Sequence, residues 1–284
     1  MQSELRIIDP ARLIVGECPL WDDQRALLYT IDIRGKCIRQ TDLTSGEHRQ
    51  FDFPQEIGCI ALCKDGDLIA GMTDGIYRIR LGETMEPVCV PKSLKGRRFN
   101  DGKVGPDGRF YVGTTDYNGQ GAFYRLDHDG TLTELFDQVG SSNGLAWSSD
   151  HRTLYYCDSP KRVLEAFEFD PGTGSLSSRR TVMSIPCDVG EFDGMTIDAQ
   201  GMLWIAGWRT FHAYRIDPVR AQVVEQIRFP VARVSCCGFA GEELSTLAIT
   251  TAAYQADASA EPLAGSTFAI RADVPGVPSW RFGA

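Results

Sequence analysis

A unit of about 42 residues recurs along the 284-residue chain, and this period restricts the possible folds more than any other feature. In each unit a polar turn is followed by a short apolar or aromatic run, and the six runs are LLYTIDI, LIAGMT, RFYVGTT, TLYYCD, MLWIAG and TLAITT. Successive turns are 42, 42, 43, 50 and 41 residues apart, at Asp23, Asp65, Asp107, Asp150, Gln200 and Gly241. A period of this length, with room for about four short strands, is typical of a propeller blade.

The repeat predicts an all-β fold, a six-bladed β-propeller built from four-stranded antiparallel blades. No helical periodicity extends over 11 or more residues, and 284/6 leaves about 47 residues for each blade. A blade has two apolar faces that its neighbours must cover, and ring closure covers the first and last blades. We therefore predict a single domain over residues 1–284, with LRIIDP near the N-terminus as the outer strand of the last blade. A β-sandwich with coincidental spacing is the alternative.

The charge and cysteine content exclude several classes of protein. With 29 basic and 38 acidic residues the net charge is −9, which disfavours binding to nucleic acid or to an anionic membrane surface. No run approaches the ~20 apolar residues of a membrane-spanning helix, and the N-terminal segment lacks the pattern of a secretory signal, so we expect a cytoplasmic protein. The nine cysteines include no zinc-type CxxC pair and are predicted to be free, buried thiols.

A polar side chain recurs in one slot of the repeat, six or seven residues before the turn. Four units carry an oxygen-bearing side chain there, and the other two offer Gly58 or its neighbours and the Ser235–Cys237 stretch. The four are Glu17, Asn100, Asn143 and Asp193. In a propeller this slot is the start of the innermost strand, so the four side chains are expected to point at one axial metal site. Oxygen donors without His or Cys suit Ca²⁺, Mg²⁺ or Mn²⁺ better than a zinc site. The alternative is that Asn-Gly and Asp-Gly pairs simply form turns.

Two further patterns bear on the chemistry. Arg97 and Arg98 directly precede Phe99 and Asn100, and an arginine fork there could bind an anionic or polyhydroxylated substrate. The alternative is a solvated charge on a loop. Residues 140–144 match the G-x-S-x-G nucleophile elbow formally, but a strand-like segment follows where that motif needs a helix, so a serine nucleophile is not predicted. The absence of a phosphate-binding glycine loop argues against a nucleotide cofactor.

Five segments together resemble the gluconolactonase/regucalcin family, also called senescence marker protein-like. They occur in the family's order, and the resemblance covers roughly residues 12–282. The segments are GECPLWDDQRALLYTIDI, RRFNDGKVGPDGRFYVGTT, GAFYRLDHDG, SSNGLAWSSDHRTLYYCDS and DGMTIDAQGMLWIAGW.

The resemblance implies a six-bladed propeller with one catalytic divalent cation, whether Ca²⁺, Zn²⁺, Mn²⁺ or Mg²⁺. It implies that Glu17, Asn143 and Asp193 bind this cation and that Asp193 also transfers the proton. It further implies that Arg98 and Asn100 bind the substrate.

The chain also departs from the family pattern at two loops. Many relatives carry an acidic, substrate-contacting loop after the glycine-threonine pair, whereas this chain has Thr115-Asp116-Tyr117-Asn118, so Asp116 or Asn118 is expected to replace the missing glutamate. Where relatives often have a glycine pair after the fifth-blade tryptophan, this chain has Arg209-Thr210-Phe211, and Arg209 is a candidate for altering substrate choice.

The combined interpretation is a divalent-metal-dependent hydrolase that opens a sugar lactone to the aldonic acid, with Asp193 as general base and acid. The partner is then a small-molecule sugar lactone, and the protein is expected to be a monomer or a weak homo-oligomer. One alternative is a calcium-binding regulatory protein with little turnover. Another is an esterase or organophosphate hydrolase that uses the same site, and an interaction platform is a third.

Overall fold

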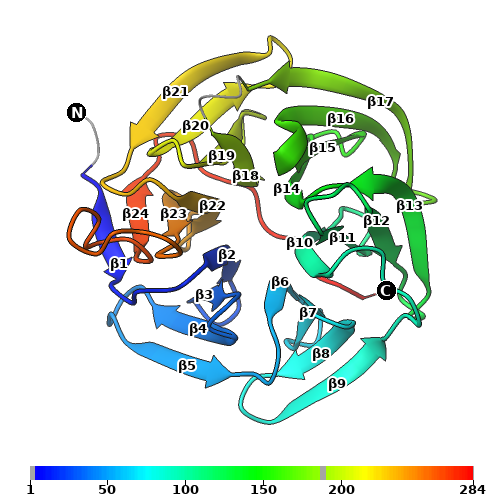
Figure 1. The fold of residues 1–284 in the computed structure, drawn as a ribbon, viewed down its shortest axis with the longest axis horizontal. Coiled ribbons are helices and arrows are strands. Elements are labelled where there is room, and N and C mark those ends of the chain that lie inside the picture. The colour runs from blue at the N-terminus through cyan, green and yellow to red at the C-terminus, as the bar shows by residue number, and fades with distance from the viewer. Residues whose placement is uncertain (1–3, 186–189, 284) are drawn as a thin grey trace. The chain divides into compact units, whose positions relative to one another are not determined.

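The computed structural model describes residues 4–185 and 190–283, which form twenty-four β-strands and one 3-10 helix of three residues. The strands assemble into six sheets of four strands, and neighbouring strands in each sheet are antiparallel. Figure 1 shows these sheets, which confirm the predicted fold class, an all-β six-bladed propeller with four-stranded blades.

Contacts divide the chain into two compact units with three sheets each. Unit 1 comprises Met1–Pro54 and Ile185–Pro278, and unit 2 comprises Gln55–Ser184 and Ser279–Ala284. The expectation of a single domain over the whole chain stays a prediction.

Unit 1 contains the β2, β18 and β22 sheets, each named here after its first strand. Their strands are β2 (Gly16–Asp22), β3 (Leu27–Asp32), β4 (Cys37–Asp42) and β5 (His48–Asp52); β18 (Glu191–Ile197), β19 (Leu203–Trp208), β20 (His212–Asp217) and β21 (Gln222–Arg228); β22 (Val234–Ala240), β23 (Thr246–Thr251) and β24 (Thr267–Arg271) with β1 (Arg6–Asp9). Arg6 of β1 lies opposite Ala269 of β24, which confirms that the N-terminal LRIIDP segment supplies the outer strand of the last sheet.

Unit 2 contains the β6, β10 and β14 sheets. Their strands are β6 (Ile57–Leu62), β7 (Leu68–Met72), β8 (Ile76–Arg80) and β9 (Thr84–Cys89); β10 (Arg98–Val104), β11 (Phe110–Thr115), β12 (Gly121–Leu126) and β13 (Leu132–Val139); β14 (Ser142–Trp147), β15 (Thr153–Asp158), β16 (Val163–Asp170) and β17 (Ser175–Ser184). The short helix η1 (Ser159–Lys161) joins β15 to β16. The serine of the G-x-S-x-G match begins strand β14, so the strand predicted there is confirmed.

The six apolar runs of the repeat form the second strand of each sheet, as predicted: β3, β7, β11, β15, β19 and β23. Strand β23 shows why these runs are apolar on both faces. Leu247 and Ile249 belong to a core cluster shared with the β18 sheet, whereas Ala248 packs with Trp21 and Leu28 of the β2 sheet. Successive residues of a strand point to opposite faces, so the β22 sheet is covered on both sides within unit 1.

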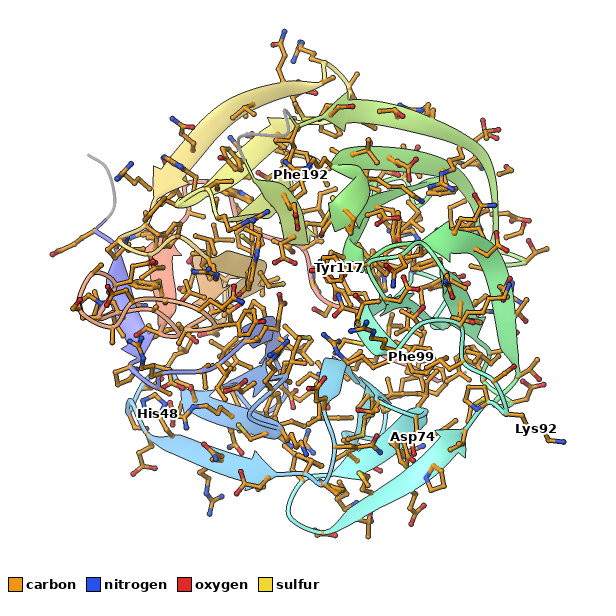
Figure 2. The ribbon with its side chains drawn as sticks, in the orientation of Figure 1. His48, Asp74, Lys92, Phe99, Tyr117 and Phe192 are labelled. Atoms are coloured by element: carbon orange, nitrogen blue, oxygen red, sulfur yellow. The ribbon has the colours of Figure 1, made fainter. Side chains whose placement is uncertain are left out.

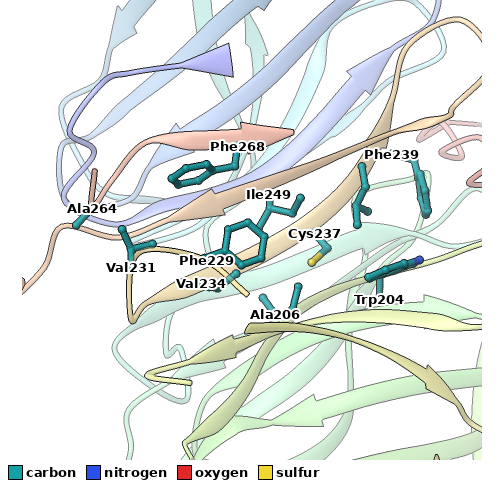
Figure 3. Close-up of a cluster of buried hydrophobic side chains, with 12 residues drawn as sticks. Trp204, Ala206, Phe229, Val231, Val234, Cys237, Phe239, Ile249, Ala264 and Phe268 are labelled. Carbon is teal, nitrogen blue, oxygen red and sulfur yellow. The ribbon is translucent and has the colours of Figure 1, made fainter. Parts of the chain in front are cut away.

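Aromatic side chains fill the space between neighbouring sheets. In unit 1, Phe229 and Phe268 meet edge to face at 5.6 Å between ring centroids, in the cluster drawn in Figure 3. In unit 2, Tyr111 of the β10 sheet and Trp147 of the β14 sheet meet in the same way at 5.3 Å. Such pairs bury large apolar areas and favour one packing geometry.

The cysteines of the described residues are free thiols, and all except Cys89 are buried; Cys187 lies outside the described residues. Burial raises the pKa of Cys37 and of Cys63 to about 11, so both are protonated at neutral pH. No helix within residues 4–185 and 190–283 is long and apolar enough to cross a membrane.

Candidate functional site

The first strand of every sheet has one residue more than its partner strand near its start, which is a β-bulge. In β2, Glu17 pairs with Ile31 but Leu20 pairs with Tyr29, so three steps along β2 match two along β3. Corresponding register shifts interrupt the pairing of β6, β10, β14, β18 and β22 with their second strands. The slot identified in the repeat lies in or beside the bulge in all six sheets, at Glu17, Gly58, Asn100, Asn143, Asp193 and Ser235.

This placement confirms that the slot lies at the start of the first strand. The Asn143-Gly144 and Asp193-Gly194 pairs lie inside strands, so the alternative that they only form turns is wrong. Spacing alone did not reveal the bulges, which redirect side chains and are common beside active sites.

The first strands are neighbours within each unit. In unit 2, β10 contacts both β6 and β14; in unit 1, β22 contacts both β2 and β18. Gly58 of β6 shows how closely they approach, because a Cβ atom on it would lie 2.3 Å from the Phe99 carbonyl oxygen of β10. The slot of β6 therefore has room only for glycine, which explains why this unit of the repeat carries no ligand-type side chain.

In unit 2 a chain of hydrogen bonds fixes the orientation of Asn100. The Arg98 guanidinium donates to Asn100 Oδ1 at 2.7 Å, and Asn100 Nδ2 donates to the Ser142 carbonyl oxygen at 2.6 Å. A guanidinium can only donate and a carbonyl can only accept, so one amide orientation satisfies both bonds. Phe99, which precedes Asn100 and is fully buried, is labelled in Figure 2.

The orientation of Asn143 follows from that of Asn100. Asn100 Nδ2 also donates to Asn143 Oδ1 at 2.7 Å, and Asn143 Nδ2 donates to Ser159 Oγ at 2.7 Å. The carbonyl oxygen of Asn143 therefore faces Asn100 and keeps a second lone pair for another partner. The sequence predicted a role for both amides but not the role of Ser159, which lies just after β15 in η1.

Arg98 connects this amide pair to the carboxylate of Glu56, the residue directly before β6. Its Nε lies 3.0 Å from Glu56 Oε2, and its side chain is largely buried. The guanidinium also donates to the Phe99 carbonyl oxygen at 2.9 Å, so these contacts hold the planar fork in one orientation.

In unit 1 the slots of β2 and β18 hold carboxylates. Glu17 and Asp193 are 7% and 6% exposed, and Oε2 of Glu17 accepts a hydrogen bond from the Cys18 backbone N–H at 3.1 Å. Phe192, the buried residue before Asp193, is labelled in Figure 2. Burying two carboxylates is costly unless positive charge or donors compensate them.

Ser235, the slot residue between these two strands, has a structural role. Its hydroxyl donates to the Gly16 carbonyl oxygen at 2.5 Å and also lies 3.0 Å from Thr250 Oγ1. The bulge of β22 is thereby tied to the start of β2, next to Glu17.

Asp101 is a buried carboxyl in the β10 bulge that sequence reasoning did not single out. Its Oδ1 accepts the Gly102 N–H at 2.7 Å, and burial raises the pKa of this carboxyl, with Lys103 and backbone donors opposing the shift. Its signal in the sequence is the Asn-Asp-Gly triplet, in which an acidic residue directly follows the slot.

The two loops that depart from the family pattern are both well ordered by hydrogen bonds. The buried Asp116 carboxylate accepts the backbone N–H groups of Asn118 and Gln120 at 2.9–3.2 Å, which closes the loop. Asn118 is exposed, and the exposed Tyr117 beside it, labelled in Figure 2, has a φ of 62°. Substrate contacts from Asp116 and Asn118 stay predictions. Arg209 lies 3.1 Å from Glu191, at the start of β18.

In residue type, the slot side chains of each unit are those that a hard divalent cation prefers. The four oxygen-bearing slot side chains are between 6% and 8% exposed and comprise two carboxylates and two amides. The described part of the chain contains no group of three or more His, Cys, Asp or Glu side chains placed to hold a metal. The predicted ligands Glu17, Asn143 and Asp193 include an amide and only two carboxylates, so they do not constitute such a group.

Buried carboxylates and amides at equivalent bulges define the class of protein: an all-β propeller with oxygen-bearing side chains at the start of its first strands. The family model described as SMP-30/Gluconolactonase/LRE-like region matches residues 15–253. The chain therefore belongs to this family, which confirms the resemblance inferred from its motifs.

Relatives match over nearly the whole chain. Regucalcin of Danio rerio is 35% identical over 278 residues, covering 94% of both chains. YvrE of Bacillus subtilis (strain 168) is 36% identical over 273 residues, covering 93% of this chain and 94% of its own. Its name suggests that it is a sugar lactone lactonase. The solved structure of regucalcin from Agrobacterium tumefaciens, described as a calcium-binding protein, superimposes with a TM-score of 0.93 at 24% identity, covering 99% of this chain and 98% of that one.

Proposed function

We propose that the protein is a divalent-cation-dependent hydrolase that opens a sugar lactone to the corresponding aldonic acid. The observation that carries the proposal is the recurrence of buried oxygen donors at four equivalent bulges. Membership of a family described as gluconolactonase-like, with a relative named as a sugar lactone lactonase, supports the same activity.

Glu17, Asn143 and Asp193 would hold the cation, and Arg98 and Asn100 would bind substrate hydroxyls. The all-oxygen donor set favours Ca²⁺, Mg²⁺ or Mn²⁺ over Zn²⁺. When bound, such a cation supplies Lewis acidity that polarises a carbonyl and stabilises negative charge on its oxygen.

Proton transfer is assigned to Asp193. Its carboxylate accepts a proton from the attacking water as the water oxygen forms a bond to the lactone carbonyl carbon. The bond between that carbon and the ring oxygen then breaks, and Asp193 returns the proton to the departing ring oxygen. The products are one carboxyl group and one hydroxyl group, so the atoms of water are accounted for and no covalent nucleophile is needed.

The Arg98–Asn100–Asn143 chain of hydrogen bonds positions the neutral part of the site. Arg98 orients Asn100, and Asn100 Nδ2 donates to one lone pair of Asn143 Oδ1. The second lone pair of that oxygen therefore points in a fixed direction. The Arg98 fork, already oriented by Glu56, suits a polyhydroxylated substrate.

The decisive experiment is acid release in a pH-stat from a panel of aldono-lactones, with and without a chelator. We expect turnover that is lost on complete metal removal and restored by one of the four candidate cations. Turnover that survives complete metal removal would contradict the cation dependence.

A calcium-binding regulatory role is the second candidate, because the relatives include regucalcins and a structure described as a calcium-binding protein. Tight Ca²⁺ binding without turnover of any lactone or ester would favour it. Turnover of simple esters or organophosphates instead of lactones would favour the esterase alternative, which uses the same residues. The cytoplasmic location and the monomeric or weakly homo-oligomeric state stay part of the proposal.

A further inference from the structure

Unit 1 carries a cluster of charged and aromatic side chains beside Asp193 that the proposed hydrolysis does not use. Glu191 lies opposite Trp208, the last residue of β19, and ion-pairs with Arg209 at 3.1 Å. The guanidinium carbon of Arg233 lies 5.8 Å from the centroid of the Trp208 ring, and the two residues form an isolated antiparallel bridge. We call Glu191, Trp208, Arg209 and Arg233 the arginine cluster.

The cluster has a surplus of positive charge. It holds two guanidinium groups and one carboxylate, and within residues 4–185 and 190–283 no carboxylate forms an ion pair with Arg233. The Glu261 carboxylate accepts a hydrogen bond from the backbone N–H of Ala232, the residue before Arg233. The two guanidinium groups outnumber the carboxylate within the cluster, and guanidinium N–H groups bind anionic oxygens through paired hydrogen bonds.

Both arginines are held in place. Thr210 closes the loop after β19, because its backbone N–H and its hydroxyl both donate to the Gly207 carbonyl oxygen, at 3.2 and 3.0 Å. Arg209 itself has a φ of 67°, a conformation that non-glycine residues rarely adopt. Its side chain is 51% exposed, so its fork keeps free donors, whereas Arg233 is half-buried on the face of Trp208.

The cluster begins on the same strand as the proposed reacting group. Glu191 precedes Asp193 by two residues on β18, which corresponds to about 7 Å along a strand. The ring of a lactone folds its carbons back, so a group on the carbon outside the ring lies to one side of the carbonyl. An anionic group on that outer carbon could therefore extend along β18 towards the arginines while the carbonyl lies near Asp193.

We infer that the arginine cluster is a binding subsite for an anionic group on the substrate, so that the preferred lactones carry a second negative charge. This inference rests on the proposed function. A planar guanidinium fork binds carboxylate and phosphate alike through paired N–H···O bonds. The substrate class is thus a sugar-acid lactone with a terminal carboxylate or phosphate.

The test compares kcat/KM for three lactones: neutral glucono-lactone, a glucaric acid monolactone with a terminal carboxylate, and 6-phosphoglucono-lactone. For the wild-type protein, kcat/KM should be at least 10-fold higher for one of the anionic lactones than for the neutral lactone. The anionic lactone with the higher kcat/KM shows whether the subsite binds a carboxylate or a phosphate. In Arg233→Gln the ratio of anionic to neutral kcat/KM should fall at least 10-fold, mainly through KM. Arg209→Gln, which changes an exposed side chain, repeats the test if Arg233→Gln fails to fold.

Arg228→Gln is the matched control. Arg228 lies over Phe211 of the same region, with 5.6 Å between its guanidinium carbon and the ring centroid, but lies outside the cluster, so its replacement should leave the ratio unchanged. A wild-type ratio near or below one, or a ratio that both cluster variants leave unchanged, would overturn the subsite.

A binding measurement separates the subsite from the proposed activity. Calorimetric titration should show glucarate binding at least 10-fold more tightly than gluconate, and this difference should disappear in Arg233→Gln. If that result holds while no lactone is hydrolysed, the subsite stands and the proposed function falls. If lactones are hydrolysed and glucarate binds no better than gluconate, the proposed function stands and the subsite is wrong.

Discussion

The first strands of the two units carry the same bulge but different chemistry. In unit 1 two slots hold the buried carboxylates Glu17 and Asp193, and the slot between them holds Ser235. In unit 2 the slots hold Gly58, Asn100 and Asn143, and the two amides bond to each other. The repeated backbone therefore provides equivalent positions in both units. The side chains at these positions are negatively charged in unit 1 and are neutral, oriented amides in unit 2.

The difference separates two tasks that a hydrolytic site needs. Carboxylates can neutralise a cation and exchange protons, whereas amides can do neither but can hold an oxygen in a fixed direction. We therefore expect replacements in unit 1 to affect chemistry and cation affinity most, and replacements in unit 2 to act through orientation.

The largest effect is expected at Asp193. Asp193→Asn keeps the shape of the side chain but removes the proton acceptor, and should lower kcat for lactone opening by about 1,000-fold at saturating cation. The measurement is pH-stat hydrolysis together with a thermal melt to verify folding. Asp257→Asn, at an exposed position of the same unit, is the control and should keep full activity; an equally active Asp193→Asn protein would rule out the proposed proton transfer.

Glu17→Gln should act mainly on cation binding. The amide keeps an oxygen that can accept the Cys18 N–H but loses the negative charge, so affinity for Ca²⁺ or Mn²⁺ should fall about 100-fold. Calorimetric titration measures this, with Glu243→Gln at an exposed position as the control. An affinity within twofold of wild type would show that Glu17 is not a ligand.

Ser159→Ala tests orientation in unit 2. Removing the hydroxyl deprives Asn143 Nδ2 of its 2.7 Å partner, which should cost about 1–2 kcal/mol in the free energy of unfolding. Cation affinity should fall about 10-fold, as for other residues that orient a ligand.

Ser159→Thr, which keeps the hydroxyl, should restore the cation affinity lost in Ser159→Ala. Urea unfolding and cation titration separate the effects on stability and on binding. If Ser159→Ala loses stability but binds the cation as tightly as wild type, the orientation of Asn143 does not depend on Ser159.

The smallest effect on the site is expected at Ser235, the slot residue with a structural role. Ser235→Ala leaves the buried Gly16 carbonyl oxygen without this donor and should cost about 1 kcal/mol in the free energy of unfolding. Cation affinity and kcat should stay within twofold of wild type. A large loss of affinity would instead place Ser235 in the cation site and erase the contrast between the slots of unit 1.

The sequence by itself determined the class of the fold. Six short apolar runs, each after a turn, specify strands through local preference and alternation, and their regular spacing specifies one sheet per repeat. The pairing of β1 with β24 was also predictable, because LRIIDP is a strand-like segment with no unit of its own. The repeat slot was predictable for the same reason, since equivalent positions in a repeat have equivalent surroundings.

Only the tertiary structure decided what the side chains in those slots do. The approach of Phe99 explains Gly58, the Arg98 fork orients Asn100, and the ring of Trp208 holds Arg233. Each of these relations joins segments that are distant in the chain or lies at a bulge that shifts side chains relative to a regular strand. Residue type and spacing in the sequence determine the period of the repeat. A bulge of one extra residue changes the direction of a side chain, and its contacts form only when neighbouring sheets pack together.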